Sequence, residues 1–386
     1  MYFCGEKQIL TPMGNPFLTF GYVSPDLFCD RIEETNRITG LLTNGNNVAL
    51  ISPRRMGKTG LLQHCFAQSE LKDKYHTFLI DIYSTRNLKE MVYAMGREIL
   101  NVLKPKGKKA FERFVHIVTS LRSGISYDAA GIPSWNLEVG DIKTPDFTLD
   151  EIFTYLENAD KPCIVAIDEF QSVKRFPEDN TEAILRTYIQ RCKNTWFIFS
   201  GSQRSMMSEI FNSPSRPFYQ SVSLMSLKAI APPSYSKFIH DHFNRQGKEI
   251  EQTVIDAVYQ QFDGVTWYVQ KLMNELFAGI KENETCRIDM LQPTIQHIVN
   301  EQEEGYKELL FRIPVKQKEL LLAISKEGKA SQITSGKFVK NHKLTSASSV
   351  QKAAKSLVEQ QLLTQELGVY EVYDKFFALW LAQSQQ

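Results

Sequence analysis

A short loop between an apolar stretch and a helical stretch restricts the fold of this chain more than any other segment. The loop, Ser52 to Thr59, reads SPRRMGKT and matches the phosphate-loop pattern GxxxxGK[ST] except at its first position, where serine replaces glycine. The preceding residues NNVALIS predict a buried strand, and TGLLQHCFAQSEL after the loop has helical spacing. A strand, a phosphate loop and a helix in this order predict an α/β sheet.

Strands and helices continue to alternate beyond this loop. The apolar stretches HTFLIDIY, CIVAIDEF and TWFIFSGS predict buried strands, and NLKEMVYAMGREILNVL and NTEAILRTYIQRCKN predict helices. Residues 26 to 42 predict one further helix ahead of the first strand. Because alternating strands and helices form a parallel, doubly wound sheet, the expected fold class is α/β, a three-layer P-loop NTPase sheet.

The chain, at 386 residues, is too long for one hydrophobic core, so two or three domains are expected from its length. SGISYDAAGIPSWNLEVG alternates like a hairpin, which indicates an insertion at about 104–147 on the rim of the sheet. The pattern is helical from about residue 233 to residue 302, with a break at DGVTW, and a new unit follows. The expected domains are a core (1–225), a helical segment (226–305) and a C-terminal unit (306–386).

Charge and cysteine content exclude several classes of protein. Lys and Arg total 45 against 44 Asp and Glu, so any contact with nucleic acid has to be local. The six cysteines form no CxxC pair and have no zinc-ligand spacing, and we assign no metal to His240 and His242, which do not share a helix face.

No apolar run has the length of a membrane span and no basic, apolar leader is visible, so we expect a cytoplasmic protein without membrane contact.

The loop residues predict a nucleotide-binding site. Successive backbone N–H groups would surround the phosphates, Gly57 would allow their close approach, Lys58 would add a positive charge, and Thr59 would offer a hydroxyl to Mg²⁺. The helix that begins near Thr59 adds its positive dipole end. The residues expected to contact the nucleotide are Pro53, Arg54, Arg55, Met56, Gly57, Lys58, Thr59 and Gly60.

An acidic pair at the end of a buried strand is the predicted partner of this loop. Asp168 and Glu169 follow CIVAI, and Mg²⁺ prefers oxygen ligands. We therefore expect Asp168 to hold the metal through water, on the same ion to which Thr59 offers its hydroxyl. Glu169, one residue later, would orient and deprotonate the attacking water, which makes it catalytic together with Lys58.

The end of the TWFIFSGSQ strand supplies further candidates. This strand is expected between the other two, so Ser202, or else Ser200 or Gln203, would reach the γ-phosphate by a hydrogen bond, although the serines also suit a turn. Arg216, with Arg204 as the alternative, would stabilise charge on the transferred phosphate, in its own chain or in a neighbour. Solvated arginines on the rim of the sheet are the other interpretation.

The last seventy residues predict three helices and a two-stranded hairpin, which is the pattern of a winged helix-turn-helix. Ser346 suits a helix N-cap, and Val350, Ala353, Ala354, Leu357 and Val358 form an apolar helix face. Five lysines give local positive charge that would meet DNA phosphates: Lys337, Lys340, Lys343, Lys352 and Lys355. The alternative is a solvated face of a domain that contacts proteins.

Together, these segments resemble the archaeal-type ATPase family of the AAA+ and STAND assemblage of P-loop proteins. The resemblance is carried by FCDRIEET, SPRRMGKTGLL, DIYSTRNLKE, CIVAIDEFQ, FIFSGSQ, FDGVTWYVQKL and VYEVYDKFFALWL. It implies an AAA+-like five-stranded sheet, a helical lid and a C-terminal winged helix. Asp30 and Arg31 match the family's pair near the adenine side of the nucleotide. FDGVT resembles its glycine-glycine-x-proline lid motif and departs from it at Asp263 and Thr266.

Two functions of different class follow from these expectations. The first is a Mg²⁺-dependent ATPase whose nucleotide cycle moves the lid and the winged helix. The second is a nucleotide-gated switch that binds DNA or a protein with negligible turnover. A GTPase is disfavoured because no [NT]KxD sequence follows the FIFSGS strand, and a small-molecule kinase because no substrate-clamping domain is expected. An arginine that acts on a neighbour's phosphate would imply a nucleotide-dependent oligomer.

Overall fold

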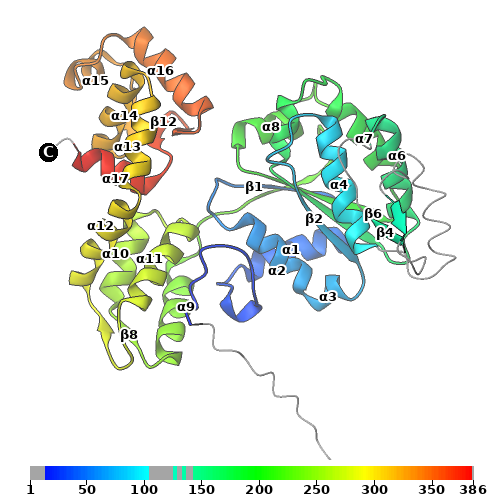
Figure 1. Ribbon diagram of the computed structural model, residues 1–386, viewed down its shortest axis with the longest axis horizontal. Helices are drawn as coiled ribbons and strands as arrows, with labels where there is room; N and C mark the ends of the chain where they lie inside the picture. Colours follow the sequence, from blue (N-terminus) through cyan, green and yellow to red (C-terminus); the bar gives the residue numbers. More distant parts are fainter. Residues whose placement is uncertain (1–13, 104–124, 128–132, 136–141, 385–386) are drawn as a thin grey trace, which may run out of the picture. The chain divides into compact units, whose positions relative to one another are not determined.

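The computed structural model describes residues 14–103, 125–127, 133–135 and 142–384 and divides the chain into two compact units (Figure 1). The first unit comprises residues Met1–His242 and Asp263–Asn274, and the second comprises Phe243–Phe262 and Glu275–Gln386. Most of the expected insertion at about 104–147 lies outside the described residues. The expected domain boundaries near residues 226 and 306 stay predictions.

A five-stranded parallel sheet organises the first unit, as the family resemblance implies. Its strand order is β2-β5-β6-β1-β7, so β1 lies between β6 and β7 and pairs with both along its whole length. The parallel pairing of β2 with β5 and of β5 with β6 completes the sheet. The strands are β1 (Val48–Ile51), β2 (His76–Asp81), β5 (Cys163–Asp168), β6 (Thr195–Gly201) and β7 (Ser223–Ser226).

Helices cover both faces of this sheet, because side chains along a strand alternate between the two faces. Val48 and Leu50 point into the core beneath one set of helices, and Ala49 and Ile51 point into the core on the other face. The first set is α1 (Ile32–Thr43), α2 (Lys58–Ala67) and α3 (Ser69–Lys72). The second set is α4 (Leu88–Val102), α6 (Pro145–Glu157), α7 (Thr181–Arg191) and α8 (Arg204–Asn212). Figure 1 shows the two layers on opposite sides of the strands.

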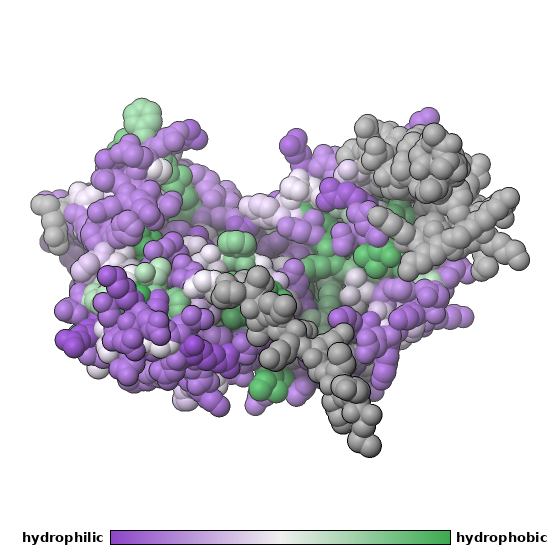
Figure 2. All heavy atoms as spheres, turned by 60° about the horizontal axis from the view of Figure 1, so that its bottom comes forward, coloured by the Kyte–Doolittle hydropathy of each residue, from purple (hydrophilic) through white to green (hydrophobic). Residues whose placement is uncertain are grey.

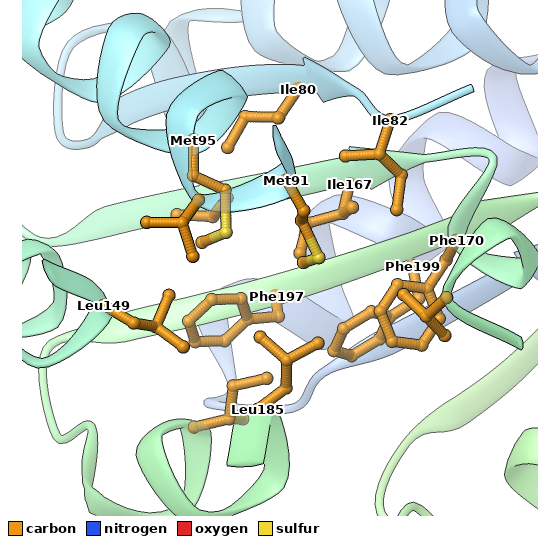
Figure 3. Packing of buried hydrophobic residues seen from close by; sticks show 14 of the residues in the cluster. Ile80, Ile82, Met91, Met95, Leu149, Ile167, Phe170, Leu185, Phe197 and Phe199 are labelled. Atoms are coloured by element: carbon orange, nitrogen blue, oxygen red, sulfur yellow. The ribbon is translucent and has the colours of Figure 1, made fainter. Parts of the chain in front are cut away.

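The core beneath α4, α6 and α7 is rich in aromatic and sulfur-containing side chains (Figure 3). Met91 and Met95 of α4 point towards the strands, and Phe197 and Phe199 of β6 stack at a centroid distance of 6.2 Å. Phe170 lies at the start of the short 3₁₀ helix η4 (Phe170–Arg175), and its ring centroid is 4.6 Å from that of Phe199. This packing fixes the carboxyl ends of β5 and β6, where the acidic pair and the polar residues follow.

The helix ahead of β1 is shorter than the sequence predicts. Pro25–Leu27 form a 3₁₀ turn, η1, and α1 begins only at Ile32. The two residues before it, Asp30 and Arg31, have φ angles of 55° and 65°. These left-handed conformations interrupt any helix, so the apolar spacing over 26–42 reflects two elements and not one.

Four further elements begin in the first unit. β3 (Ile125–Tyr127) pairs antiparallel with β4 (Pro133–Trp135), as expected for the predicted hairpin, whose turn lies outside the described residues. α9 (Pro232–Arg245) follows β7, and α11 (Thr266–Ala278) begins after the glycine-containing break at residues 263–265.

The second unit contains the winged helix that the sequence predicts. Its helices are α14 (Val315–Glu327), α15 (Gly336–Asn341) and α16 (Ala347–Glu359). Its antiparallel sheet has the order β10-β12-β11, in which β10 (Ala330–Ser331) follows α14 in the chain, and β11 (Leu363–Glu366) and β12 (Val369–Val372) follow α16. The side chain of Ser346 caps α16, and Val350, Ala353, Ala354 and Leu357 are buried, as predicted, with Val358 half-buried. Its other elements are β8 (Glu249–Ile250), α10 (Gln252–Gln261), β9 (Thr285–Cys286), η5 (Ile288–Met290), α12 (Leu291–Glu301), α13 (Glu303–Arg312) and α17 (Lys375–Gln383).

Hydrophilic side chains cover much of the face shown in Figure 2, and hydrophobic side chains appear there in smaller groups. None of the helices in the described part of the chain has the length and apolar content needed to cross a membrane.

Candidate functional site

The predicted phosphate loop connects the end of β1 with the first turn of α2. Gly57 caps α2 with a φ angle of 90°, a conformation that glycine adopts without a steric penalty. Lys58 donates from Nζ to the backbone carbonyls of Ser52 (2.9 Å) and Pro53 (3.1 Å), so its ammonium group lies inside the curve of the loop. Only 6% of Lys58 is exposed, and this burial lowers its pKa while the nearby carboxylates of Glu169 and Asp168 oppose the shift.

Serine at the first position of the loop continues the pairing of the sheet. The backbone N–H of Ser52 donates to the carbonyl of Gly201 at 3.2 Å, one residue past the end of β1. Its hydroxyl lies 3.3 Å from the carbonyl of Pro53, and the residue is buried. With serine in place of glycine, the start of the loop therefore remains hydrogen-bonded to β6.

Thr59 and Asp168 meet across the sheet, at the start of α2 and the end of β5. Thr59 Oγ1 donates to Asp168 Oδ2 at 2.7 Å, and the backbone N–H of Glu169 donates to Asp168 Oδ1 at 3.0 Å. A hydroxyl oxygen and a carboxylate oxygen at this separation are two ligands of the kind that Mg²⁺ prefers. The donor set therefore fits the predicted metal.

The side chain of Glu169 is held by two neighbours. One carboxylate oxygen accepts hydrogen bonds from Ser202 Oγ at 2.7 Å and from Gln171 Nε2. The backbone of Glu169 is left-handed, with a φ angle of 55°, which turns its side chain away from the direction of β5. The structure thus brings Glu169 and Ser202 together, as expected for neighbouring strand ends.

Gln171 belongs to the site although its motif context predicts no role for it. It is 1% exposed and donates to both Glu169 and Ser202. Gly201 makes room for it: a Cβ atom at residue 201 would lie 2.5 Å from Gln171 Oε1. The phosphate-loop pattern and the acidic pair assign no role to a glutamine at this position, and only the spacing Glu-x-Gln within CIVAIDEFQ places it near the site.

Arg31 links the segment before β1 to the loop. Its Nη1 forms an ion pair with Glu34 at 2.8 Å, and Nη2 lies 3.4 Å from the carbonyl of Met56. Arg31 is buried and Asp30 is exposed. Both residues adopt the left-handed conformation described above, which directs Arg31 towards the loop.

The two loop arginines have different surroundings. The guanidinium of Arg54 lies 4.9 Å from the ring centre of Tyr83. The guanidinium of Arg55 lies 4.3 Å from the ring centre of Trp267 and also donates to the Tyr268 hydroxyl. Arg55 has a φ angle of 68°, and its carbonyl accepts the N–H of Trp267 at 3.0 Å. The first turn of α11 is therefore attached to the phosphate loop.

A pocket with a volume of about 280 Å³ opens beside the loop. Its walls include the loop residues 54–60, Glu169, residues 18–23 ahead of η1, and Thr266, Trp267 and Gln270 of α11. The ring of Phe28, on the wall of this pocket, stacks on the ring of His64 with a centroid distance of 4.3 Å. Burial lowers the pKa of His64. Space for a flat apolar group thus adjoins the phosphate loop.

The predicted arginines lie elsewhere in the first unit. Arg216 forms ion pairs with Glu209 at 3.0 Å and with Glu182 at 3.4 Å, and burial raises the pKa of Glu182. Arg204 is the first residue of α8 and is exposed. Neither arginine is among the described residues that line the pocket, and their roles stay predictions. Ser200 is buried in β6, and Gln203 precedes α8.

Comparison with known proteins agrees with this architecture. A family model for an ATPase domain predominantly from Archaea matches residues 28–272, and a model for a probable winged helix domain matches residues 304–383. No curated protein matches the sequence closely enough to count as a relative.

Among solved structures, the Walker-type ATPase Paby2304 of Pyrococcus abyssi is similar, with a TM-score of 0.62, 17% identity and coverage of 95% of this chain and 99% of that chain. The Orc2 protein of Aeropyrum pernix, in its ADPNP-ADP complexes, has a TM-score of 0.54, 12% identity and coverage of 96% and 98%. The Orc1 protein of the same organism, in complex with DNA, has a TM-score of 0.52, 12% identity and coverage of 93% and 94%. At these identities the likeness concerns the fold.

Proposed function

The chain belongs to the family of ATPase domains found predominantly in Archaea, and we propose that it hydrolyses ATP with Mg²⁺ at the site between the phosphate loop and the ends of β5 and β6. The observation that carries this proposal is the 2.7 Å contact between Thr59 Oγ1 and Asp168 Oδ2. This contact joins two expected metal-binding residues, Thr59 of α2 and Asp168 of β5. The carboxylate of Glu169, the next residue, is not part of this contact.

In this proposal the loop binds the phosphates. The backbone N–H groups of the loop and the positive end of the α2 dipole attract the phosphate oxygens. Lys58, which lies inside the loop, exchanges its backbone carbonyl contacts for the phosphates. Mg²⁺, held by Thr59 and Asp168, would neutralise charge on the phosphates. The proposed nucleotide contacts are the predicted ones: Asp30, Arg31, Pro53, Arg54, Arg55, Met56, Gly57, Lys58, Thr59, Gly60 and Ser202.

Glu169 is the proposed group that orients the attacking water and accepts its proton. Its hydrogen bonds from Ser202 and Gln171 support this role because they hold the carboxylate at the ends of the central strands. Both donors act on the same oxygen, which leaves the other oxygen available to a water molecule. Gln171 is therefore a positioning residue in the proposal.

The proposal extends to the second unit. Hydrolysis would change the position of the helices after β7 and of the winged helix, which would contact DNA or a protein. The five lysines predicted to meet phosphates are exposed on or beside α15 and α16, which supports an anionic partner. Arg216 or Arg204 would complete a neighbour's site only if the protein forms an oligomer with nucleotide bound.

The test is phosphate release from ATP by the full chain, with and without Mg²⁺. Lys58→Ala should lose nucleotide binding and release together, whereas Glu169→Gln should keep ADP binding and lose release. Lys72→Ala and Glu70→Gln change exposed residues of α3 and serve as matched controls. Thermal unfolding confirms that each variant is folded.

The outcomes separate the two candidate functions. Release that requires Mg²⁺ and is lost in both site variants supports the ATPase. Tight ATP binding without release at any protein concentration, with or without DNA, overturns the enzyme proposal in favour of a nucleotide-gated binding protein. Release per chain that rises with protein concentration supports an arginine supplied by a neighbour, and release independent of concentration argues against it.

A further inference from the structure

One face of α11 connects the phosphate loop with the segment at residues 15–17. Thr266, Gln270 and Asn274 are spaced by four residues and therefore share this face. At one end, Thr266 Oγ1 donates to the carbonyl of Met56 at 3.3 Å. At the other end, Asn274 Nδ2 donates to the carbonyl of Phe17 at 2.7 Å. Gln270 thus lies one helical turn beyond the loop, between two residues that are held by hydrogen bonds, Thr266 and Asn274.

Gln270, between these two residues, has a side-chain oxygen without a hydrogen-bond partner in the described part of the chain. The residue is 7% exposed, and Oε1 is buried without a hydrogen bond to any part of the chain that the structure describes. Gln270 also lines the pocket beside the phosphate loop. A buried carbonyl without a donor costs free energy, and a ligand that brings a donor into the pocket removes this cost.

The position of Gln270 fits the base of a nucleotide. Phosphates bound by the loop leave the nucleoside in the remaining pocket, whose walls include the apolar side chains of Leu27, Phe28 and Ile230. These side chains suit the flat faces of a purine, and a polar group at the rim then recognises its edge. A glutamine amide matches adenine, because its carbonyl accepts from the exocyclic N6 amine while its NH₂ group donates to N7. Guanine presents two acceptors, O6 and N7, at the same edge.

We propose that Gln270 reads the base of the bound nucleotide and selects adenine over guanine. This inference rests on the proposed function, because the nucleotide has to occupy the pocket beside the loop. It adds a residue that no motif assigns and places base selection on α11, the helix that is also attached to the loop through Arg55 and Met56.

The test is calorimetric binding of ADP, GDP and inorganic pyrophosphate, each with Mg²⁺, to the full chain. The wild type should bind ADP at least about tenfold more tightly than GDP, the size of one good bidentate contact. Gln270→Leu, of similar volume, should weaken ADP about tenfold and leave GDP and pyrophosphate unchanged, so that the preference for ADP disappears. Gln270→Asn keeps the amide one methylene shorter and should retain part of the preference.

Gln63→Leu is the matched control, since Gln63 of α2 also has a buried Oε1 without a partner in the described part of the chain, but is not among the described residues that line the pocket. The Gln63 variant should keep the wild-type ratio of ADP to GDP affinity. A wild-type ratio in Gln270→Leu overturns the inference, as does an equal loss of ADP and pyrophosphate binding, which indicates damage to the loop. Absence of ADP binding to the wild type refutes the proposed function instead.

Discussion

Replacing Gly201 with alanine tests whether Gln171 positions Glu169. Gly201 ends β6, and a Cβ atom there would lie 2.4 Å from Met207 Sδ and 2.5 Å from Gln171 Oε1. Carbon makes favourable contacts only at about 3.5–4.0 Å, so both side chains have to move. Gly201 is absent from the residues with positive φ, so alanine fits its backbone and the change acts through packing.

The size of the effect follows from these contacts. Forcing one extra methyl group into a filled core costs about 1–3 kcal/mol of the free energy of unfolding. Gln171, once displaced, loses its hydrogen bond to the Glu169 carboxylate, and such a bond to a charged group is worth about 1.5–3 kcal/mol. If the lost bond serves hydrolysis, kcat falls roughly tenfold to a hundredfold, since each 1.36 kcal/mol is a factor of ten.

The assays are urea unfolding, ADP binding and phosphate release at saturating ATP. Gly201→Ala should unfold at lower urea, keep its ADP affinity and lose kcat. Gln171→Ala should lose kcat to a similar extent, and the double variant should lose less than the sum because both changes remove the same contact. Gly40→Ala changes a helical glycine of α1 whose Cβ position has no atom of a described residue within 4 Å, and it should be neutral or stabilising. A stable Gly201→Ala protein with wild-type kcat would refute this reasoning.

Three other predictions concern separate parts of the chain. Asp374→Ala removes the side chain that caps α17 and should lower the free energy of unfolding by about 1 kcal/mol, with Asp374→Asn close to wild type in urea unfolding. Arg55→Lys keeps the charge beside Trp267 but loses the planar stacked group, so it should lower the thermal midpoint, and an unchanged midpoint would contradict this role. Burial raises the pKa of Cys163 from 9.0 to about 12, so the unfolded thiol ionises first and stability falls as pH rises through this window. Cys163→Ala should reduce that fall in urea unfolding at stepwise higher pH, and an unchanged fall would argue against it.

The parts of the fold that follow local patterns were predictable from the sequence. β1, the phosphate loop and α2 form one continuous segment in which apolar residues, a glycine and helical spacing follow in order. β5 is an uninterrupted apolar run that ends in Asp168, so its carboxyl end could be placed beside the loop. The helix expected over 26–42 was wrong at its start, because a left-handed backbone at Asp30 and Arg31 leaves no signal in apolar spacing.

The parts of the site that depend on distant contacts could not be predicted. Gln171 gains its role from Ser202 and from the absence of a side chain at Gly201, about thirty residues later, and no local spacing reports that contact. The role of Gln270 could not be predicted, because helical spacing alone does not distinguish a glutamine beside a pocket from one in solvent.

The central place of β1 has a consequence for the order in which the protein is made. β1 pairs with β6 and with β7. Val48 of β1 lies opposite Ile198 of β6 and Ser223 of β7. The ribosome releases these partners long after the phosphate loop, so a nascent chain that contains the loop lacks both neighbours of the strand that carries it. Contacts between residues so distant in sequence form slowly, because a long segment has to be closed first. A nucleotide can therefore act as a late ligand that stabilises the completed sheet, and a chain truncated before β7 should gain no stability from it.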